Sequence, residues 1–289
     1  MHIKALSLLK ALLPVKTIYI IIIAALFSCS KNPPSSNSTP SQGTTQTPAV
    51  EKPYSLVWSD EFNIDGLPDV AKWDYDIGGN GWGNNELQYY TKRPDNAYIT
   101  KGNLVIETKL EPYLGRNYTS ARLITKNKAA WTYGKFEIRA KIPKGRGTWP
   151  AIWLLSSSDP LHWPDDGELD IMEEVGFTPN VIHGTAHNKL YNGANGKQKG
   201  GNITIADAQD SFHTYSIEWT TSEITWSVDG TTYFTYANIY GGDAWPYYKD
   251  FFMILNTAVG GNWGGQQGVE DSVFPQQMLI DYVRVYQRK

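Results

Sequence analysis

The 289-residue chain is dominated beyond residue 54 by short segments in which apolar and polar residues alternate, and helical periodicity is scarce. Alternation in period two places the apolar side chains on one face of a strand. An Asp229-Gly230 pair, a hairpin turn signal, separates two such segments. The clearest segments are residues 103–108, 134–142, 214–219, 224–228, 232–234 and 278–286. The sequence therefore predicts one all-β domain built as a sandwich of strands.

One predicted strand is unusual because acids interrupt its aliphatic residues. Residues 166–174 read Asp-Gly-Glu-Leu-Asp-Ile-Met-Glu-Glu. Glu168 and Asp170 are two residues apart, so on a strand they share a face. Like charges this close raise each other's pKa, which makes the cluster costly unless it has a function. Glycoside hydrolysis needs two carboxylates, one as nucleophile and one as acid/base.

The position of Glu173 sets a geometric condition on that hypothesis. It lies five residues after Glu168, so strict alternation would place it on the opposite face of the strand. One extra residue in the strand, a β-bulge near Ile171-Met172, would return it to the same face. We then expect Glu168, Asp170 and Glu173 to face one cleft and Glu174 to face away. Without the bulge the two-carboxylate hypothesis fails.

The N-terminus is typical of an export signal. Three lysines precede an apolar run at residues 18–27 that is short for a membrane span. Residues 26–29 read Leu-Phe-Ser-Cys, and Cys29 is the only cysteine of the chain. This segment resembles the lipobox of bacterial lipoproteins, which implies cleavage before Cys29 and lipidation of that residue. The alternative is an ordinary signal peptide with an incidental cysteine.

Composition defines three regions of the chain. Residues 1–28 are the predicted lipoprotein signal peptide, and residues 29–53 form a linker rich in Ser, Thr and Pro that cannot bury a core. Residues 54–289 are the predicted folded domain. The net charge of −3 gives no reason to expect a nucleic-acid partner. The 11 Trp and 18 Tyr residues favour a sugar site, because pyranose faces stack on aromatic rings, although aromatic residues also fill cores.

Across residues 54–289 the chain resembles glycoside hydrolase family 16, and within it the bacterial laminarinases, which are endo-acting β-1,3-glucanases. The resemblance is strongest in Gly-Glu-Leu-Asp-Ile-Met-Glu at 167–173 and Trp-Pro-Ala-Ile-Trp at 149–153. The other matching segments are residues 58–62, 85–90, 183–187, 212–215, 255–263 and 281–286. The resemblance implies a β-jelly roll of two antiparallel sheets with a concave substrate cleft. It also implies a retaining hydrolase, with no catalytic cofactor, that cleaves internal β-1,3 bonds of laminarin-type glucans.

The resemblance assigns roles to individual residues. Glu168 is the expected nucleophile, Asp170 its helper and Glu173 the acid/base. The residues expected to bind substrate are Asn85, Glu86, Arg122, Trp149, Trp153, His187, Asn262 and Trp263. For three of these residues the alternative to substrate binding is a structural role. Trp153 and His187 would then be core residues, and Arg122 would form a salt bridge to one of the acids. His187 is expected beside the acid/base, and His183 is assigned a structural role.

The resemblance also implies a structural calcium ion on the convex side, held by Glu61, the carbonyl of Gly102, and Asp281. The alternative is that Glu61 and Asp281 bind arginines or water. The expected protein is a monomer whose only membrane contact is the lipid anchor. The lipobox places it on a bacterial membrane, with the outer membrane or cell surface as the expected location.

Competing functions remain open at this point. The same fold and carboxylates serve mixed-linkage β-glucan and galactans as well as β-1,3-glucan. A lectin of the same fold that has lost catalysis is a second class, although it would usually lack one of the three carboxylates. A third is a metal site built from Glu168, Asp170, Glu173 and His187.

Overall fold

The computed structural model describes residues 52–288. The predicted signal peptide, most of the predicted linker, and Cys29 lie outside the described residues, so these predictions stay predictions. In the described part, no helix is long and apolar enough to cross a membrane. Its helical content is limited to three 3-10 turns, η1 (Gly193–Asn195), η2 (Gly242–Ala244) and η3 (Asp271–Val273).

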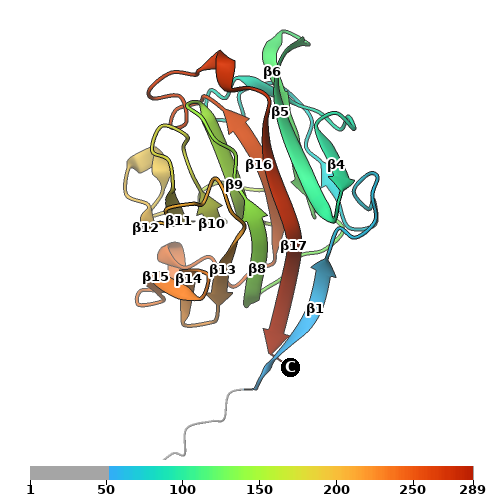
Figure 1. The fold of residues 1–289 in the computed structure, drawn as a ribbon. Coiled ribbons are helices and arrows are strands. Elements are labelled where there is room, and N and C mark those ends of the chain that lie inside the picture. Colours follow the sequence, from blue (N-terminus) through green and yellow to red (C-terminus); the bar gives the residue numbers. More distant parts are fainter. Residues whose placement is uncertain (1–51, 289) are drawn as a thin grey trace, which may run out of the picture. The chain divides into compact units, whose positions relative to one another are not determined.

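Two sheets make up the domain (Figure 1). The seven-stranded sheet runs in the order β12 (Lys199–Thr204), β11 (Val181–His187), β10 (Glu168–Glu173), β9 (Thr148–Ser156), β16 (Phe251–Val259), β7 (Arg122–Ile124) and β2 (Asp74–Tyr75). The predicted catalytic segment is therefore an inner strand of this sheet, β10, with β9 and β11 as its neighbours.

The ten-stranded sheet contains the remaining strands. Its order is β15 (Thr231–Ala237), β14 (Glu223–Val228), β13 (His213–Trp219), β8 (Gly134–Lys141), β17 (Gln276–Arg288), β5 (Asn103–Tyr113), β6 (Arg116–Ser120) and β3 (Gln88–Tyr90). Two more strands pair off this path, β1 (Tyr54–Asp60) with β17 and β4 (Ala97–Thr100) with β5. The described strand pairs are antiparallel except β3 with β6, which is parallel. The predicted all-β jelly roll is confirmed.

Period two in the sequence becomes alternating burial in the structure. Along β8, alternate residues from Gly134 onward are buried and the residues between them are half-buried. Its buried side chains join one core that fills the space between the sheets, with Trp219 and Trp226 among the largest fully buried residues. The predicted hairpin between β14 and β15 is also present, with Asp229 and Gly230 both at positive φ.

One hydrogen bond joins the two sheets directly below the acidic strand. The indole N–H of Trp226, on β14, donates to the backbone carbonyl of Asp170 at 2.7 Å. Gly184, on β11, permits this close packing because a Cβ there would lie 2.3 Å from Cδ1 of Trp226. The core thus fixes the backbone of β10 at the point where its register changes.

Candidate active site

The register of β10 contains the predicted bulge. Against β11, Asp170 pairs with Thr185 and Glu173 with His183, so three steps along β10 match two along its partner. Against β9 the shift lies between Asp170 and Met172. The extra residue is accommodated around Ile171 and Met172, both of which are buried. The spacing of the acids therefore predicted a real irregularity of the strand.

The bulge brings Glu168, Asp170 and Glu173 to one face of the seven-stranded sheet. Glu174 faces away and is fully buried. Its carboxylate accepts hydrogen bonds from the backbone N–H of Asn180 at 2.6 Å and from the side chain of Gln209 at 2.9 Å. Burial raises the pKa of Glu174 to about 7 despite these donors.

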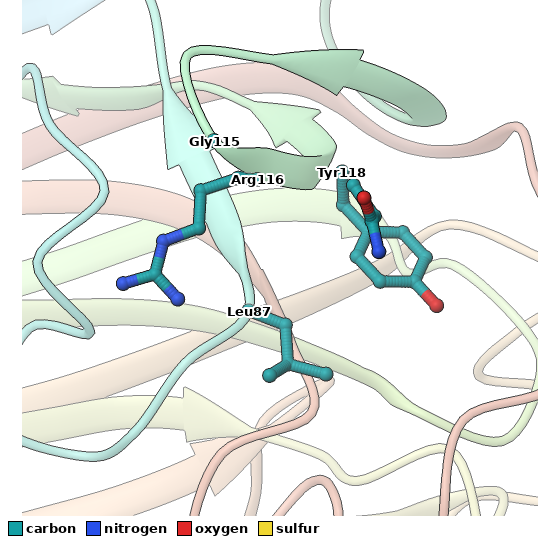
Figure 2. A pocket seen from close by; sticks show the side chains of 5 residues that line it. Leu87, Gly115, Arg116 and Tyr118 are labelled. Carbon is teal, nitrogen blue, oxygen red and sulfur yellow. The ribbon is translucent and has the colours of Figure 1, made fainter.

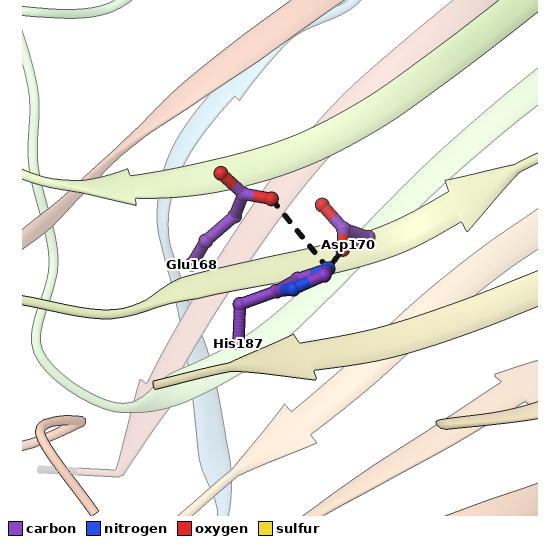
Figure 3. Close-up of side chains that lie close together, drawn as sticks. All are labelled: Glu168, Asp170 and His187. Carbon is purple, nitrogen blue, oxygen red and sulfur yellow. Dashed lines mark ion pairs between the residues drawn. The ribbon is translucent and has the colours of Figure 1, made fainter. Parts of the chain in front are cut away.

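Glu168 accepts a hydrogen bond from an aromatic residue of the preceding loop. Oε2 of Glu168 receives the indole N–H of Trp163 at 3.0 Å, and Oε1 lies 3.7 Å from Nε2 of His187 (Figure 3). Burial and then the charge of Asp170 raise the pKa of Glu168 to about 7, while the Trp163 N–H and the His187 ring lower it. The group is thus close to the balance between its acid and its ionised form at neutral pH.

Asp170 and His187 form a close pair between the two glutamates. Nε2 of His187 lies 3.0 Å from Oδ2 of Asp170, whose side chain is 4% exposed. Burial lowers the pKa of His187, but the bond to Asp170 and the charges of Glu168 and Glu173 outweigh it and raise that pKa to about 9. Glu168, Asp170 and Glu173 are thus the carboxylates of β10 that act on the His187 ring.

A backbone donor opposes the second protonation of His187. The N–H of Gly193 donates to Nδ1 of the ring at 3.0 Å, which requires a free lone pair on Nδ1. In this geometry Nδ1 carries no proton and the proton of the ring is on Nε2. The second proton that the raised pKa favours would have to displace the Gly193 N–H from Nδ1. The prediction placed His187 beside the acid/base; its contacts are instead with Asp170 and Glu168.

Glu173 has its own indole donor. The N–H of Trp149 donates to Oε1 of Glu173 at 2.9 Å. Burial and then the charge of Asp170 raise the pKa of Glu173 well above its usual value, and the Trp149 bond lowers it only in part. Glu173 is therefore the group that retains its proton to higher pH, and because the acids interact, their observed pKa values belong to the group.

An aromatic cluster surrounds Glu173. The ring of Trp149 meets Trp263 edge-on at a centroid distance of 5.7 Å, and Trp263 meets His183 at 5.0 Å. His183, assigned a structural role from the sequence, thus lies against an expected substrate-binding residue and opposite Glu173 in register. Burial lowers the pKa of His183, which favours a neutral ring there.

Arg122, on β7, lies between Trp82, which is in a turn, and Trp153, which is on β9 of the same sheet. Its guanidinium carbon is 4.7 Å from the ring centre of Trp82 and 4.8 Å from that of Trp153. Nε of Arg122 pairs with Asp76 at 2.9 Å. The salt-bridge alternative is therefore found, but with Asp76 rather than with a catalytic acid. Trp153 is half-buried on the same face as Trp149, since the two are four residues apart on β9.

The predicted rim residues divide into two groups. The amide of Asn85 donates to Asn262 at 2.8 Å, and both residues are exposed. Glu86 is only 6% exposed, and its carboxylate accepts hydrogen bonds from Gln88 and Tyr90. The carboxylate of Glu86 is thus held by donors of the protein, and its backbone bridges Gly260; direct substrate contact by Glu86 stays a prediction.

The residues predicted to hold calcium are engaged with arginines. Both oxygens of Glu61 accept from Arg284, at 3.0 and 2.7 Å, and Asp281 is paired with Arg139. The arginine alternative is thus the one found. A calcium ion held by Glu61, Gly102 and Asp281 would have to displace both guanidinium groups, so the donors present do not form a ready cage.

A different group has the composition of a metal site. One carboxylate oxygen each of Glu168 and Asp170 and a ring nitrogen of His187 lie within 4.8 Å of one another (Figure 3). With Nε2 bound to a metal, a neutral ring would carry its proton on Nδ1, directly against the N–H of Gly193, so that backbone donor disfavours a metal here.

A small hollow lies elsewhere, on the ten-stranded sheet. Leu87, Gly115, Arg116, Asn117 and Tyr118 line it near the β5–β6 hairpin (Figure 2). It shares no residue with the carboxylate group or with the predicted substrate-binding residues, so it is not the catalytic site.

The sequence did not single out Trp163, Trp82 or Asn256. Trp163 was detectable as an aromatic residue five positions before Glu168, but it lies in a loop, where no periodicity places a side chain. Asn256, on β16, accepts the indole N–H of Trp153 at 2.7 Å, a contact that depends on strand order.

Comparison with known proteins places this site in a family. The model of glycosyl hydrolases family 16 matches residues 84–284. The chain belongs to that family. A curated relative, the beta-glucanase of Rhodothermus marinus, is 56% identical over 243 residues, which are 81% of this chain and 85% of that protein. The glucan endo-1,3-beta-glucosidase of Cryptopygus antarcticus is 39% identical, covering 76% of this chain and 85% of that protein.

A solved structure agrees with the fold. The X-ray structure of the laminarinase from Rhodothermus marinus superimposes with a TM-score of 0.80 at 54% identity, covering 82% of this chain and 98% of that one. Family membership makes the chain a glycoside hydrolase that needs no catalytic cofactor.

The two indole donors make a paired prediction for the pH dependence of hydrolysis. The Trp163 N–H stabilises ionised Glu168, so Trp163→Phe raises the pKa of Glu168 and moves the acid limb of kcat/KM to higher pH by about one unit. Trp149→Phe raises the pKa of Glu173 by the same reasoning and moves the basic limb to higher pH. Profiles of kcat/KM measured from pH 4 to 10 for both variants check this, and a variant that shifts neither limb contradicts the assigned donor.

Proposed function

We propose that the domain is a retaining endo-β-1,3-glucanase that cleaves laminarin-type glucans. The observation that carries the proposal is the bulge in β10, which gives Glu168 and Glu173 a common face and separate indole donors. Two of the similar proteins, a laminarinase and a glucan endo-1,3-beta-glucosidase, support the choice of substrate.

The first chemical step divides between the two glutamates. Glu168, in its ionised form, attacks the anomeric carbon and forms a covalent glycosyl-enzyme, while Glu173 gives its proton to the leaving oxygen. The strongly raised pKa of Glu173 supports its role as the acid, because the group then holds the proton that the leaving oxygen needs.

The second step reverses the role of Glu173. As a carboxylate it takes a proton from water, which attacks the glycosyl-enzyme and releases Glu168. Asp170 lies between the two acids, and its Oδ2 is 3.0 Å from Nε2 of His187. Its charge raises the pKa of both glutamates, and we propose that it is the helper that keeps Glu173 protonated while Glu168 ionises.

The surrounding side chains suit an uncharged sugar chain. Trp149, Trp153 and Trp263 offer aromatic surfaces for pyranose rings, and Arg122, Asn85 and Asn262 offer hydrogen-bond donors. The complete carboxylate set argues against a lectin that has lost catalysis. Mixed-linkage β-glucan is the second candidate substrate, and product profiles on laminarin, lichenan, agarose and carrageenan distinguish it from β-1,3-glucan and from galactans.

Removal of either carboxylate charge tests the assignment of roles. Glu173→Gln should lower kcat on laminarin by about 10²- to 10⁴-fold, the usual contribution of a general acid. Glu168→Gln should lower it at least as much, because no glycosyl-enzyme can form. On an aryl glucoside with a good leaving group, Glu173→Gln should lose less than Glu168→Gln, since acid assistance is then less needed. Near-normal rates in either variant, with the thermal transition unchanged, would show that the roles are misassigned.

We also propose that the protein is exported and anchored by lipid on Cys29, as a monomer. The apolar run, the Leu-Phe-Ser-Cys sequence and the polar linker support this. Calcium binding is not included, because both acids concerned are bound to arginines.

The lipid anchor predicts the distribution of a cysteine variant. Cys29→Ser should move the protein from the membrane fraction of the producing cell into the soluble fractions. The variant has no thiol to carry lipid, so no acyl chain holds the protein in the bilayer. Fractionation followed by immunoblotting measures this, with Ser28→Ala as the matched control. An unchanged distribution would refute lipidation.

A further inference from the structure

A buried chain of hydrogen bonds runs from Glu86 to the substrate-facing ring of Trp153. The hydroxyl of Tyr90 donates to Oε2 of Glu86 at 3.2 Å. The amide of Asn256 donates to the hydroxyl of Tyr90 at 3.0 Å, and the indole N–H of Trp153 donates to Oδ1 of Asn256 at 2.7 Å. Three strands or loops that are distant in sequence are thereby joined beneath one aromatic side chain.

The chain is enclosed by protein. Tyr90 is 0% exposed, Asn256 5% and Glu86 6%. Gln88, also 0% exposed, donates to Oε2 of Glu86 at 2.6 Å and accepts the backbone N–H of Val259 at 2.8 Å. A buried polar group that loses its partner here cannot form a hydrogen bond to water instead. Breaking any bond of the chain therefore leaves a desolvated, unpaired polar group, and this cost keeps the bonds formed.

The two ends of the chain fix the direction of every link. An indole N–H can only donate, and an ionised carboxylate can only accept. Asn256 must therefore present its oxygen to Trp153 and its N–H to Tyr90, and Tyr90 must direct its proton to Glu86. The amide and the hydroxyl have no alternative arrangement that satisfies both ends, so the indole of Trp153 is held in one orientation.

The held ring is next to the reacting groups. Trp153 pairs in register with Asp170 on β10, and the guanidinium carbon of Arg122 lies 4.8 Å from the centre of its ring. A tilt of the indole would displace both the aromatic surface and Arg122 from the face that a sugar chain would contact.

We propose that Tyr90 is a positioning residue for substrate binding, and that the Glu86–Tyr90–Asn256 chain orients the Trp153 indole against the glucan. The proposal rests on the proposed function, since it takes the ring of Trp153 as a sugar contact. It also gives Glu86 a role behind the binding face.

The test is a double-mutant cycle between Tyr90→Phe and Trp153→Phe on laminarin. Tyr90→Phe removes only the hydroxyl and should raise KM about fivefold, the factor that corresponds to one lost hydrogen bond, with kcat changed less than twofold. In the Trp153→Phe background, Tyr90→Phe should add no further change in KM, because the ring it orients is gone.

The matched control is Tyr215→Phe. Tyr215 is another fully buried tyrosine, on β13, and its hydroxyl has no hydrogen-bond partner within residues 52–288. That variant should leave KM unchanged, and thermal unfolding of all variants shows whether the fold is retained.

Two outcomes overturn the inference. Additive effects of the two changes on KM would mean that Tyr90 acts by general stabilisation and not through Trp153. An unchanged KM in Tyr90→Phe, with KM raised in Trp153→Phe, would mean that the ring needs no support from the chain, while the proposed hydrolysis stands. Failure of the proposed function itself would appear separately, as full activity in Glu168→Gln.

Discussion

The site depends on one extra residue in β10. Without the register shift between Asp170 and Glu173, strict alternation would turn Glu173 to the opposite face of the strand and bring Glu174 beside Glu168 and Asp170 in its place. The sandwich fixes this irregularity from below, through the bond of the Trp226 indole to the Asp170 carbonyl and through Gly184, which leaves room for that indole. A bulge is locally unfavourable, and the core supplies the packing that retains it.

The second constraint is electrostatic. Three carboxylates on a largely buried face repel one another, and each donor around them reduces that cost for one acid. The Trp163 indole donates to Glu168 and the Trp149 indole donates to Glu173, while Nε2 of His187 lies 3.0 Å from Oδ2 of Asp170. Both glutamates have an indole donor, and the charge of Asp170 raises the pKa of each. Because the acids interact, they titrate as a group, in which one acid can be ionised while the other is protonated.

The parts that periodicity governs were predictable from the sequence. Alternation gave the strands, and the parity of Glu168 and Glu173 required the bulge. The contacts that the sequence did not specify depend on partners that are distant in sequence. The backbone of Glu86 bridges Gly260, and Glu61 contacts Arg284 beside the pairing of β1 with β17. Trp163 lies in a loop, where no period exists to place it.

The stereochemistry of the first product tests the central claim most directly. If the bulge makes Glu168 a nucleophile and Glu173 its acid/base, water arrives after a first inversion, and two inversions restore the original configuration. Proton NMR of laminarin hydrolysis, recorded before mutarotation, should show the β anomer as the first product. An α anomer formed first would contradict the account.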